Sequence, residues 1–364
     1  MWLSLLGAGI QGAWAWTWDG ATAQEPASQG ELPASCSVVV CCHNEAHRMA
    51  RLAEHLRPAL DHAEGLGMVV TVVAVNHGST DDTQRELEHV AGLDARWHVV
   101  SVPRTQASKK EALNAAMDAA TGDVRVMTDA DCVPLDVSWL SHMARGANAM
   151  WDVCVGISLP VEPSHGRLGW LARCQRLEAR RLAQRATGAV DAGRPYLAFG
   201  RNMAVTAHMW ARVGGFDGHT HVPSGDDDLW LQEATRRGAR VSVQPVREAQ
   251  TASEWPASWG AWRRQKTRHF TASPSYPWQV KARLLVPGLG WTLLAAGVVH
   301  NPSGTSVALA GFALLSRALT FGMFLHRAGL PGRDAWELLL EPVVSAFRAW
   351  AWWKGSTSES TPWK

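Results

Sequence analysis

Short apolar runs alternate with amphipathic segments through the first third of the chain. Apolar runs of strand length occur at four places, residues 37–42, 68–75, 97–102 and 124–128. Residues 49–60, after the first run, place apolar side chains at the three- and four-residue spacing of a helix with one buried face. Further helices are predicted over 83–90 and 109–120. Strands that are apolar along their length and alternate with helices indicate a mostly parallel sheet in an α/β domain.

Polar side chains cluster where three of these predicted strands end. The first strand runs into His43–Glu45, the second into Asn76–Ser79, and the fourth into Asp129–Asp131. In a parallel α/β sheet the ligand crevice lies outside the carboxyl ends of the strands. The sequence therefore predicts a functional site at this edge of the sheet.

From about residue 281 the chain changes to long apolar runs. Residues 284–299 and 306–325 are two such runs, separated by a turn at 301–304. Basic residues flank both outer ends of this hairpin, as expected when both ends lie in the cytoplasm. Arg317 interrupts the second run and would be costly facing lipid. The pattern favours a re-entrant or two-span membrane hairpin, and two core helices of a soluble protein are the alternative.

The two ends of the chain are rich in tryptophan. Residues 1–19 are apolar but short for a membrane span, which favours an interfacial anchor over a spanning helix. A packed or disordered terminus is the alternative. Residues 336–353 suit a helix at the level of lipid headgroups. The predicted division is an N-terminal apolar segment and linker (1–35), an α/β domain (36–280) and membrane-associated helices (281–364).

Composition narrows the class of partner. Of 364 residues, 46% are hydrophobic and 19% are charged, and the formal net charge is +2. This balance provides no basic field for nucleic acid. The 20 tryptophans agree with a soluble body that carries a membrane-facing end.

The six cysteines indicate neither zinc nor disulfides. None forms a CxxC pair, and none has a histidine at metal-ligand spacing. Most lie in or beside apolar runs, where a free cysteine packs as a small apolar side chain. We therefore expect buried free thiols.

Two carboxylates one residue apart follow the fourth predicted strand. Asp129 and Asp131 on a turn can hold a hard divalent cation such as Mg²⁺ or Mn²⁺ and leave coordination positions open for a substrate diphosphate. No GxxxxGK[ST] or GxGxxG loop is present, which argues against kinase and dehydrogenase functions.

The order of motifs resembles the family 2 glycosyltransferases, inverting enzymes of GT-A fold that use nucleotide sugars. Seven segments carry the resemblance: VVVCCHNE (38–45), VNHGSTDDT (75–83), SKKEALN (108–114), DAD (129–131), GRNMA (200–204) with GGFD (214–217), SGDDDL (224–229) and QKTRH (265–269). Together they cover roughly 36–270. The combination of the GRNMA, GGF and SGDDDL segments is similar to a membrane-associated bacterial branch of the family.

The resemblance implies roles for individual residues. Glu45, Asn76 and His77 would line the nucleoside pocket, Lys109 would face the diphosphate, and Asp129 would lie near the ribose and metal. Asp131 would be the principal metal ligand. The family usually has Asp-Asp where Asn76-His77 stands, so the donor base is open.

The carboxylates after residue 224 supply the expected catalytic base. Asp226 matches the family's catalytic Asp, and Asp227 is the second candidate. The acceptor and closure side would include Gly200, Asn202, Asp228, Gln265, Arg268 and His269. The basic segment 263–268 has a second interpretation, a juxtamembrane patch that binds anionic lipid.

These features predict a metal-assisted, hexosyltransferase-type enzyme at the cytoplasmic membrane, with its α/β domain facing the cytoplasm. Its partners would be a nucleotide-sugar donor and a lipid-linked or glycan acceptor. The alternatives are a catalytically degenerate relative that acts as a binding or scaffold subunit, and a nucleotidyltransferase. The helical segment 155–200 is rich in arginine, for which a solvated helix face is favoured over contact with an anionic acceptor.

Overall fold

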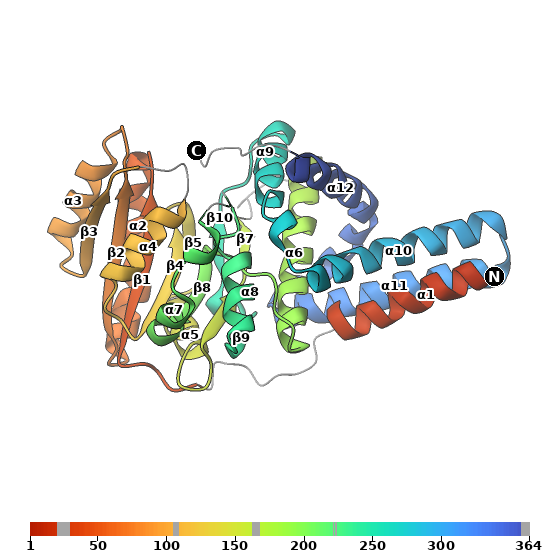
Figure 1. Ribbon diagram of the computed structural model, residues 1–364, viewed down its shortest axis with the longest axis horizontal. Coiled ribbons are helices and arrows are strands. Elements are labelled where there is room, and N and C mark those ends of the chain that lie inside the picture. Colours follow the sequence, from red (N-terminus) through yellow and green to blue (C-terminus); the bar gives the residue numbers. More distant parts are fainter. Residues whose placement is uncertain (20–29, 105–108, 162–167, 221, 223, 358–364) are drawn as a thin grey trace.

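The computed structural model describes residues 1–19, 30–104, 109–161, 168–220, 222 and 224–357. An α/β domain carries a bundle of long helices that projects from one side (Figure 1). Its main sheet has the strand order β3-β2-β1-β4-β8-β6-β9. Strand β8 is antiparallel to β4 and β6, and the other pairings are parallel. The strands are β1 Ser35–Cys42, β2 Val69–His77, β3 Trp97–Val102, β4 Val124–Asp129, β6 Val153–Gly156, β8 Asn202–Thr206 and β9 Val241–Gln244.

A second, smaller sheet of three short strands lies beside the main sheet. It has the order β5-β10-β7, with bounds β5 Cys132–Pro134, β7 Ser158–Pro160 and β10 Thr251–Ser253. Because β5 directly follows the Asp129–Asp131 turn and pairs with β10, this sheet brings that turn close to Glu254.

Helices cover both faces of the main sheet. One core holds Leu52, Leu56 and Leu87 against one face, and the other holds Leu113 and Trp230 against the opposite face. The helices of these layers are α2 Met49–Gly65, α3 Thr83–Leu93, α4 Lys109–Ala119, α5 Trp139–Gly146, α6 Trp170–Asp191, α7 Ala207–Val213, α8 Asp228–Arg236 and α9 Trp259–Phe270. The predicted α/β class, with a mostly parallel sheet and apolar C-terminal helices, is confirmed.

The C-terminal part is helical, as the apolar runs predicted. Helices α10 Trp278–His300 and α11 Gly304–Arg327 form the hairpin, and α12 Glu341–Thr357 returns to the α/β domain after a 3-10 segment at Gly332–Leu340. Both hairpin helices are long and apolar enough to cross a membrane, and they are mostly exposed. The six cysteines are buried and free.

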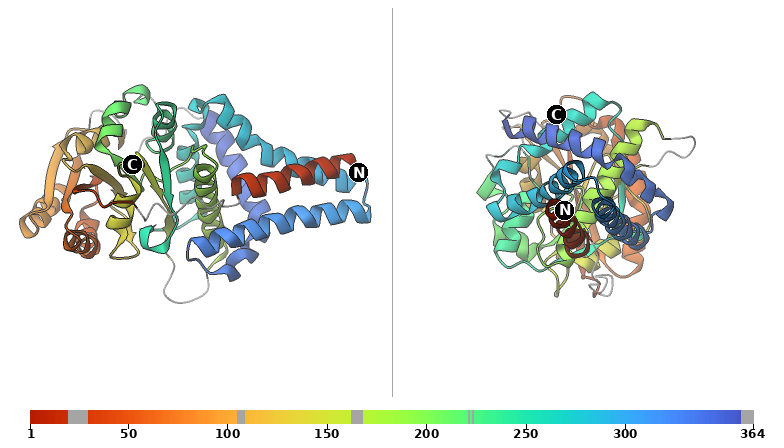
Figure 2. Two further views of the ribbon diagram at one scale, coloured as in Figure 1. Left: turned by 90° about the horizontal axis from the view of Figure 1, so that it is seen from below. Right: turned by 90° about the vertical axis from the view of Figure 1, so that its right-hand side faces the viewer.

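The N-terminal helix α1 Trp2–Trp14 completes the bundle by packing along α10 and α11, as Figure 2 shows in both views. A Cβ added at Gly7 would lie 2.5 Å from the backbone nitrogen of Leu294, so the two backbones touch. Gln11 Nε2 also donates to the carbonyl of Pro287 at 2.6 Å. Close approach through small residues, with polar side chains bonding across helices, is typical of helices that associate in membranes. Residues 20–29 of the predicted linker lie outside the described residues.

Two arginines of α6, Arg180 and Arg181, are buried in ion pairs with distant segments. Arg180 Nη1 lies 2.7 Å from Asp334 Oδ2, and Arg181 Nη2 lies 2.8 Å from Asp19 Oδ2. Only 2% and 3% of these arginine side chains are exposed. The prediction of a solvated helix face is therefore wrong, because carboxylates from both ends of the chain cover that face.

Arg317 also faces protein. Its guanidinium pairs with Glu341 and donates to Gln11 Oε1 at 3.3 Å. The cation that interrupts the second apolar run therefore lies between α11, α12 and α1, where a charge has partners that lipid could not offer.

Candidate active site

The register of the sheet brings the predicted strand ends together. Cys42 at the end of β1 pairs with Asn76 of β2, and Cys41 pairs with Asp129 of β4. The polar residues that follow each strand therefore share one edge of the sheet, as expected for a parallel arrangement.

The loop after β1 is tied to the loop after β2. Asn44 has a positive φ of 57°, a conformation that Asn tolerates better than most residues. Its side-chain oxygen accepts from Thr80 N at 2.8 Å. Glu45 N donates to Thr83 Oγ1 at 2.8 Å, and the Glu45 carboxylate pairs with Arg48. Glu45 thus lies at the edge of the site, mostly buried, with its charge compensated.

The Asn76-His77 pair is bound into the protein. Asn76 Nδ2 donates to Gln84 at 2.8 Å, and its Oδ1 accepts from Ser79 N at 3.2 Å. His77 is fully buried, and its Nε2 lies 2.9 Å from Glu111 Oε2. His77 at the end of β2 is therefore paired with a carboxylate from α4.

Lys109 joins two of the predicted carboxylates. Its Nζ pairs with Asp129 Oδ1 and lies 3.7 Å from Asp226 Oδ2. Burial lowers the pKa of Lys109, but the charges of Asp129 and Asp226 outweigh this effect, and the pKa is raised above its ordinary value. The ammonium is therefore held charged between β4 and the acidic run.

The three consecutive aspartates have different surroundings. Asp227 accepts from Gly200 N at 3.0 Å and Asp228 N at 2.8 Å. Asp228 accepts from Ala198 N at 3.1 Å and from the Tyr276 hydroxyl. Among the contacts between described residues, Asp226 has an ion pair with Lys109 and no hydrogen bond. Asp227 and Asp228 thus hold the fold, and Asp226 presents its carboxylate to the site.

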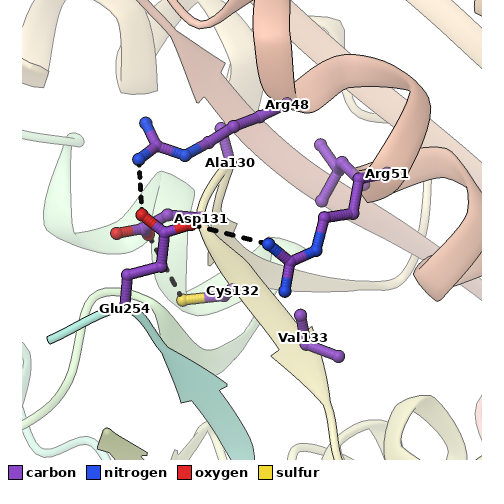
Figure 3. A pocket seen from close by; sticks show the side chains of 8 residues that line it. Arg48, Arg51, Ala130, Asp131, Cys132, Val133 and Glu254 are labelled. Atoms are coloured by element: carbon purple, nitrogen blue, oxygen red, sulfur yellow. Dashed lines mark hydrogen bonds and ion pairs between the residues drawn. The ribbon is translucent and has the colours of Figure 1, made fainter. Parts of the chain in front are cut away.

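The Asp129–Asp131 turn borders a small pocket (Figure 3). Arg48 Nη2 lies 2.7 Å from Glu254 Oε2, and Arg51 Nη1 lies 3.5 Å from Glu254 Oε1. Asp131 Oδ1 accepts from the Cys132 thiol at 3.7 Å. Two arginines and an acidic turn therefore share one side of the site.

The donor set fits a cation that also binds substrate. No group of three His, Cys, Asp or Glu side chains suited to a metal occurs in the part of the chain that the structure describes. The carboxylates of Asp129 and Asp131 are nevertheless hard oxygen donors, which Mg²⁺ and Mn²⁺ prefer, and such ions usually keep positions for substrate oxygens. A cation here would depend on phosphate oxygens and water to complete its shell.

Helix α9 carries the predicted closure residues. Thr271, just after it, hydrogen bonds through its hydroxyl to Ser224 at 2.7 Å and so ties the helix end to the acidic run. His269 is exposed, and Gln265 and Arg268 are half-buried. Lys266 instead pairs with Glu178 at 2.7 Å and fastens α9 to α6. None of these three residues makes an ion pair between described residues, and His269 lies within electrostatic range of Lys109.

The other two predicted acceptor residues have different environments. The backbone of Gly200 contacts the acidic run, and a Cβ there would lie 3.4 Å from Asp226 Oδ2. Asn202 is fully buried. Its amide donates to Ile157 O at 2.7 Å and Ala249 O at 2.9 Å, and so fastens the two sheets together.

Sequence reasoning missed several residues of this site. Arg201 is half-buried, makes no ion pair within the described ranges, and lies close enough to His269 to affect its charge. Tyr276 bonds Asp228, and Lys110 Nζ donates to Val222 O at 2.7 Å. Arg201 lies inside the GRNMA segment and could have been found there. The other two reach the site from segments whose proximity is tertiary.

We expect Asp227 to make stability fall as pH rises from about 4 to about 6. Burial and the neighbouring Asp226 raise the pKa of Asp227 from 3.8 to about 6. In this window the unfolded chain has lost its proton while the folded chain retains it, so rising pH favours unfolding, by about 2 kcal/mol. Thermal unfolding of the wild type and of Asp227→Asn at both pH values measures this. The same pH slope in both proteins would contradict it.

Comparison with known proteins agrees with this geometry. The profile of "Glycosyl transferase family 2" matches residues 37–205, from β1 into β8. A similar solved structure is mannosyltransferase PcManGT from Pyrobaculum calidifontis in complex with GDP-Man and Mn²⁺, with 18% sequence identity and a TM-score of 0.54. The similarity covers 96% of this chain and 97% of that chain. At this identity it shows the fold alone, which is of the GT-A type.

A second similar structure is S. aureus TarS 1-349, at 13% identity and a TM-score of 0.44. The similarity covers 88% of this chain and 90% of that chain. A search of curated proteins finds no significant match.

Proposed function

The segment 37–205 belongs to glycosyl transferase family 2, and on this premise we propose that the protein is an inverting, metal-assisted hexosyltransferase. It would move a sugar from a nucleotide-sugar donor to a membrane-associated or lipid-linked acceptor. The observation that carries the proposal is the line of charge from Asp129 through Lys109 to Asp226 at the carboxyl edge of the sheet.

Each member of this line has a chemical task. Asp226 accepts the proton of the acceptor hydroxyl as that oxygen attacks the anomeric carbon, opposite the departing diphosphate. Attack from the opposite face inverts the configuration at that carbon. Lys109 stabilises the negative charge that develops on the leaving group, and this electrostatic contribution is usually the largest single one. A divalent cation held by Asp129 and Asp131 would add positive charge at the same phosphate oxygens when bound.

The donor pocket would lie between the loops after β1 and β2. Glu45, Asn76 and His77 border it, but their side chains bond to Arg48, Gln84 and Glu111. Because these side chains are already bonded within the protein, a second function is also supported: a family relative that binds its ligand without catalysing transfer. Turnover distinguishes the two.

We expect the purified protein to release a nucleoside diphosphate from at least one sugar nucleotide in a panel of donors, and EDTA to abolish the release. Added Mn²⁺ or Mg²⁺ should restore it, and Asp131→Ala should remain inactive with either metal. Donor binding without turnover across the panel would favour the binding subunit. Undiminished activity of Asp131→Ala would contradict the metal assignment.

Membrane attachment is the second part of the proposal. Helices α10 and α11 have 23 and 24 residues, a length of about 35 Å at 1.5 Å per residue, enough for a hydrocarbon core of about 30 Å. Their outer faces expose large apolar side chains such as Leu285, Leu289 and Leu315. Lys281 and Arg333 flank the end at the α/β domain, which would place that domain in the cytoplasm.

We expect the protein to remain in washed membranes and to require detergent for extraction. Asn301 lies exposed in the hairpin turn, and all native cysteines are buried. An Asn301→Cys variant should therefore react with an impermeant maleimide added to intact cells, whereas Asp118→Cys, on the exposed surface of α4, should react only after lysis. A protein that is soluble and monodisperse without detergent would contradict the attachment. The reverse labelling pattern would contradict the orientation.

A further inference from the structure

An aromatic groove lies between α9 and α12, outside the catalytic edge of the sheet. Trp262 and Phe347 stack at its base, with ring centroids 4.0 Å apart and an interplanar angle of 16°. Trp259 packs edge-on against Phe347 at 6.1 Å. The groove has a volume of about 410 Å³, and its lining is Trp259, Gly260, Arg263, Phe347 and Trp350.

Gly260 lines the groove and has room for a side chain. At Gly260 an added Cβ would meet nothing closer than Arg264 Nη1 at 3.6 Å and Ser258 Oγ at 3.8 Å. At the other end of the helix pair, a Cβ at Gly355 would lie 2.5 Å from Thr267 O, so there the two backbones are in contact. The helices thus touch at one end and leave the other end accessible.

The groove combines an apolar wall with a cation. Arg263 Cζ lies 5.6 Å from the centre of the Trp350 ring, and this arginine is exposed. It makes no ion pair with any residue in the described ranges, and no acidic residue lines the groove. An arginine fork held beside aromatic rings suits a phosphate whose attached hydrocarbon chain lies on those rings.

The position of the groove points to a ligand from the membrane. Helices α9 and α12 lie beside the junction of the α/β domain with the bundle (Figure 1). Trp278, at the first residue of α10, and Trp352 and Trp353 of α12 are exposed nearby in the fold. Ser273 and Ser356 hydroxyls, 3.4 Å apart, connect the end of α12 to the turn before α10. Exposed tryptophans at the end of apolar helices are typical of the headgroup region of a bilayer.

The groove also leads to the catalytic edge along a single helix. Arg263 and Arg268 are five residues apart on α9, a distance of about 7.5 Å at 1.5 Å per residue. His269 follows and lies among the cations of the site, including Lys109. A lipid held at Arg263 would therefore lie on the same helix as the predicted closure residues, about 1.4 turns along the helix from Arg268.

We propose that this groove binds the lipid acceptor itself, a phosphate-bearing amphiphile whose hydrocarbon chain lies on Trp259, Phe347 and Trp350, whose phosphate pairs with Arg263 and whose acceptor hydroxyl lies on a group beyond the phosphate. This inference rests on the proposed function and names the class of its acceptor. Arg263 is a binding residue in this arrangement and takes no part in proton transfer.

The test uses the full-length protein in detergent, with farnesyl phosphate as the probe and farnesol as the neutral comparison. Gly260→Leu adds a large side chain to the lining of the groove, and Arg263→Gln removes the cation. We expect each to weaken farnesyl phosphate binding at least about tenfold in calorimetry. The matched controls Gly260→Ala and Arg264→Gln should bind like the wild type, and farnesol should bind more weakly than its phosphate.

Equal binding by all variants would overturn the inference, as would farnesol binding as tightly as farnesyl phosphate. A third result would also overturn it. If Arg263→Gln lowers co-sedimentation with phosphatidylglycerol vesicles but leaves farnesyl phosphate binding unchanged, the groove binds bulk anionic lipid and not the acceptor. The proposed function fails separately. A protein that shows the expected binding pattern but releases no nucleoside diphosphate from any donor supports the groove and contradicts the enzyme.

Discussion

The Asp226→Asn variant should lose sugar transfer by about 10³-fold while its folding and donor binding stay close to those of the wild type. A positioned general base contributes about 10²–10⁴-fold to proton transfer, and the amide of Asn cannot accept a proton at neutral pH. The variant keeps the size and shape of the side chain. The loss should therefore appear in kcat, measured as release of nucleoside diphosphate in the presence of acceptor.

The assignment of this role to Asp226 follows from what its neighbours do. The carboxylate of Asp227 accepts from two backbone amides, and that of Asp228 accepts from Ala198 N and Tyr276. Both are occupied in holding the loop at Gly200 and the start of α8. Asp226 has Lys109 at 3.7 Å, which leaves carboxylate oxygen directions for an incoming hydroxyl.

Two variants give this prediction its controls. Asp118→Asn changes an exposed carboxylate at the end of α4 and should leave transfer unchanged. Asp227→Asn should mainly change thermal stability, because it keeps only one of the two oxygens that accept from backbone amides and also removes the buried charge. If Asp226→Asn remains active while a well-folded Asp227→Asn is inactive, the base is Asp227.

Lys109→Met should reduce both stability and transfer. Removing the ammonium takes away the cation that Asp129 and Asp226 share. Breaking a buried ion pair costs about 3–5 kcal/mol. Asp129 is one-third exposed, however, and water screens part of this cost, so we expect about 2 kcal/mol. Loss of the charge beside the leaving diphosphate should lower transfer by about 10²-fold.

A double-mutant cycle separates these two effects. Adding Asp129→Asn to Lys109→Met removes one of the two carboxylates that Lys109 paired, so thermal stability should partly recover while transfer should not. Lys109→Arg retains the charge and should be more stable than Lys109→Met. A Lys109→Met protein as stable as the wild type would show that this lysine does not hold the two carboxylates together.

The strands lie close to where the sequence predicted them, and the reason is local. Residues 97–102 form β3 as predicted, and the strands ending near His43, Asn76 and Asp129 differ from their predicted bounds by a few residues. Apolar runs of strand length need burial on both faces, and a parallel sheet between two helix layers supplies it. The same reasoning placed the polar strand ends at one edge, and the register confirms that placement.

For the arginines of α6, the local sequence pattern predicted solvent exposure, and this prediction was wrong for Arg180 and Arg181. Arg180 and Arg181 are charged residues on a helix with few apolar side chains, a pattern that usually means solvent exposure. Their partners are Asp334 and Asp19, more than 150 positions away in each case. A side chain's own sequence neighbourhood holds no information about such partners, so burial of these charges could not be predicted.

The sequence by itself determined the α/β class, the edge of the sheet where polar residues gather, the apolar hairpin and the resemblance of segment 37–205 to glycosyl transferase family 2. All of these depend on periodicity, on strand ends or on motif order, which are properties of short segments. The tertiary structure alone decided the contacts of the run 226–228: Asp227 and Asp228 accept hydrogen bonds, and Asp226 pairs with Lys109. It also decided that Asn202 fastens two sheets, and that α1 packs with α10 and α11. These outcomes depend on which distant groups meet, because a hydrogen bond or an ion pair is settled by position in space and not by spacing along the chain.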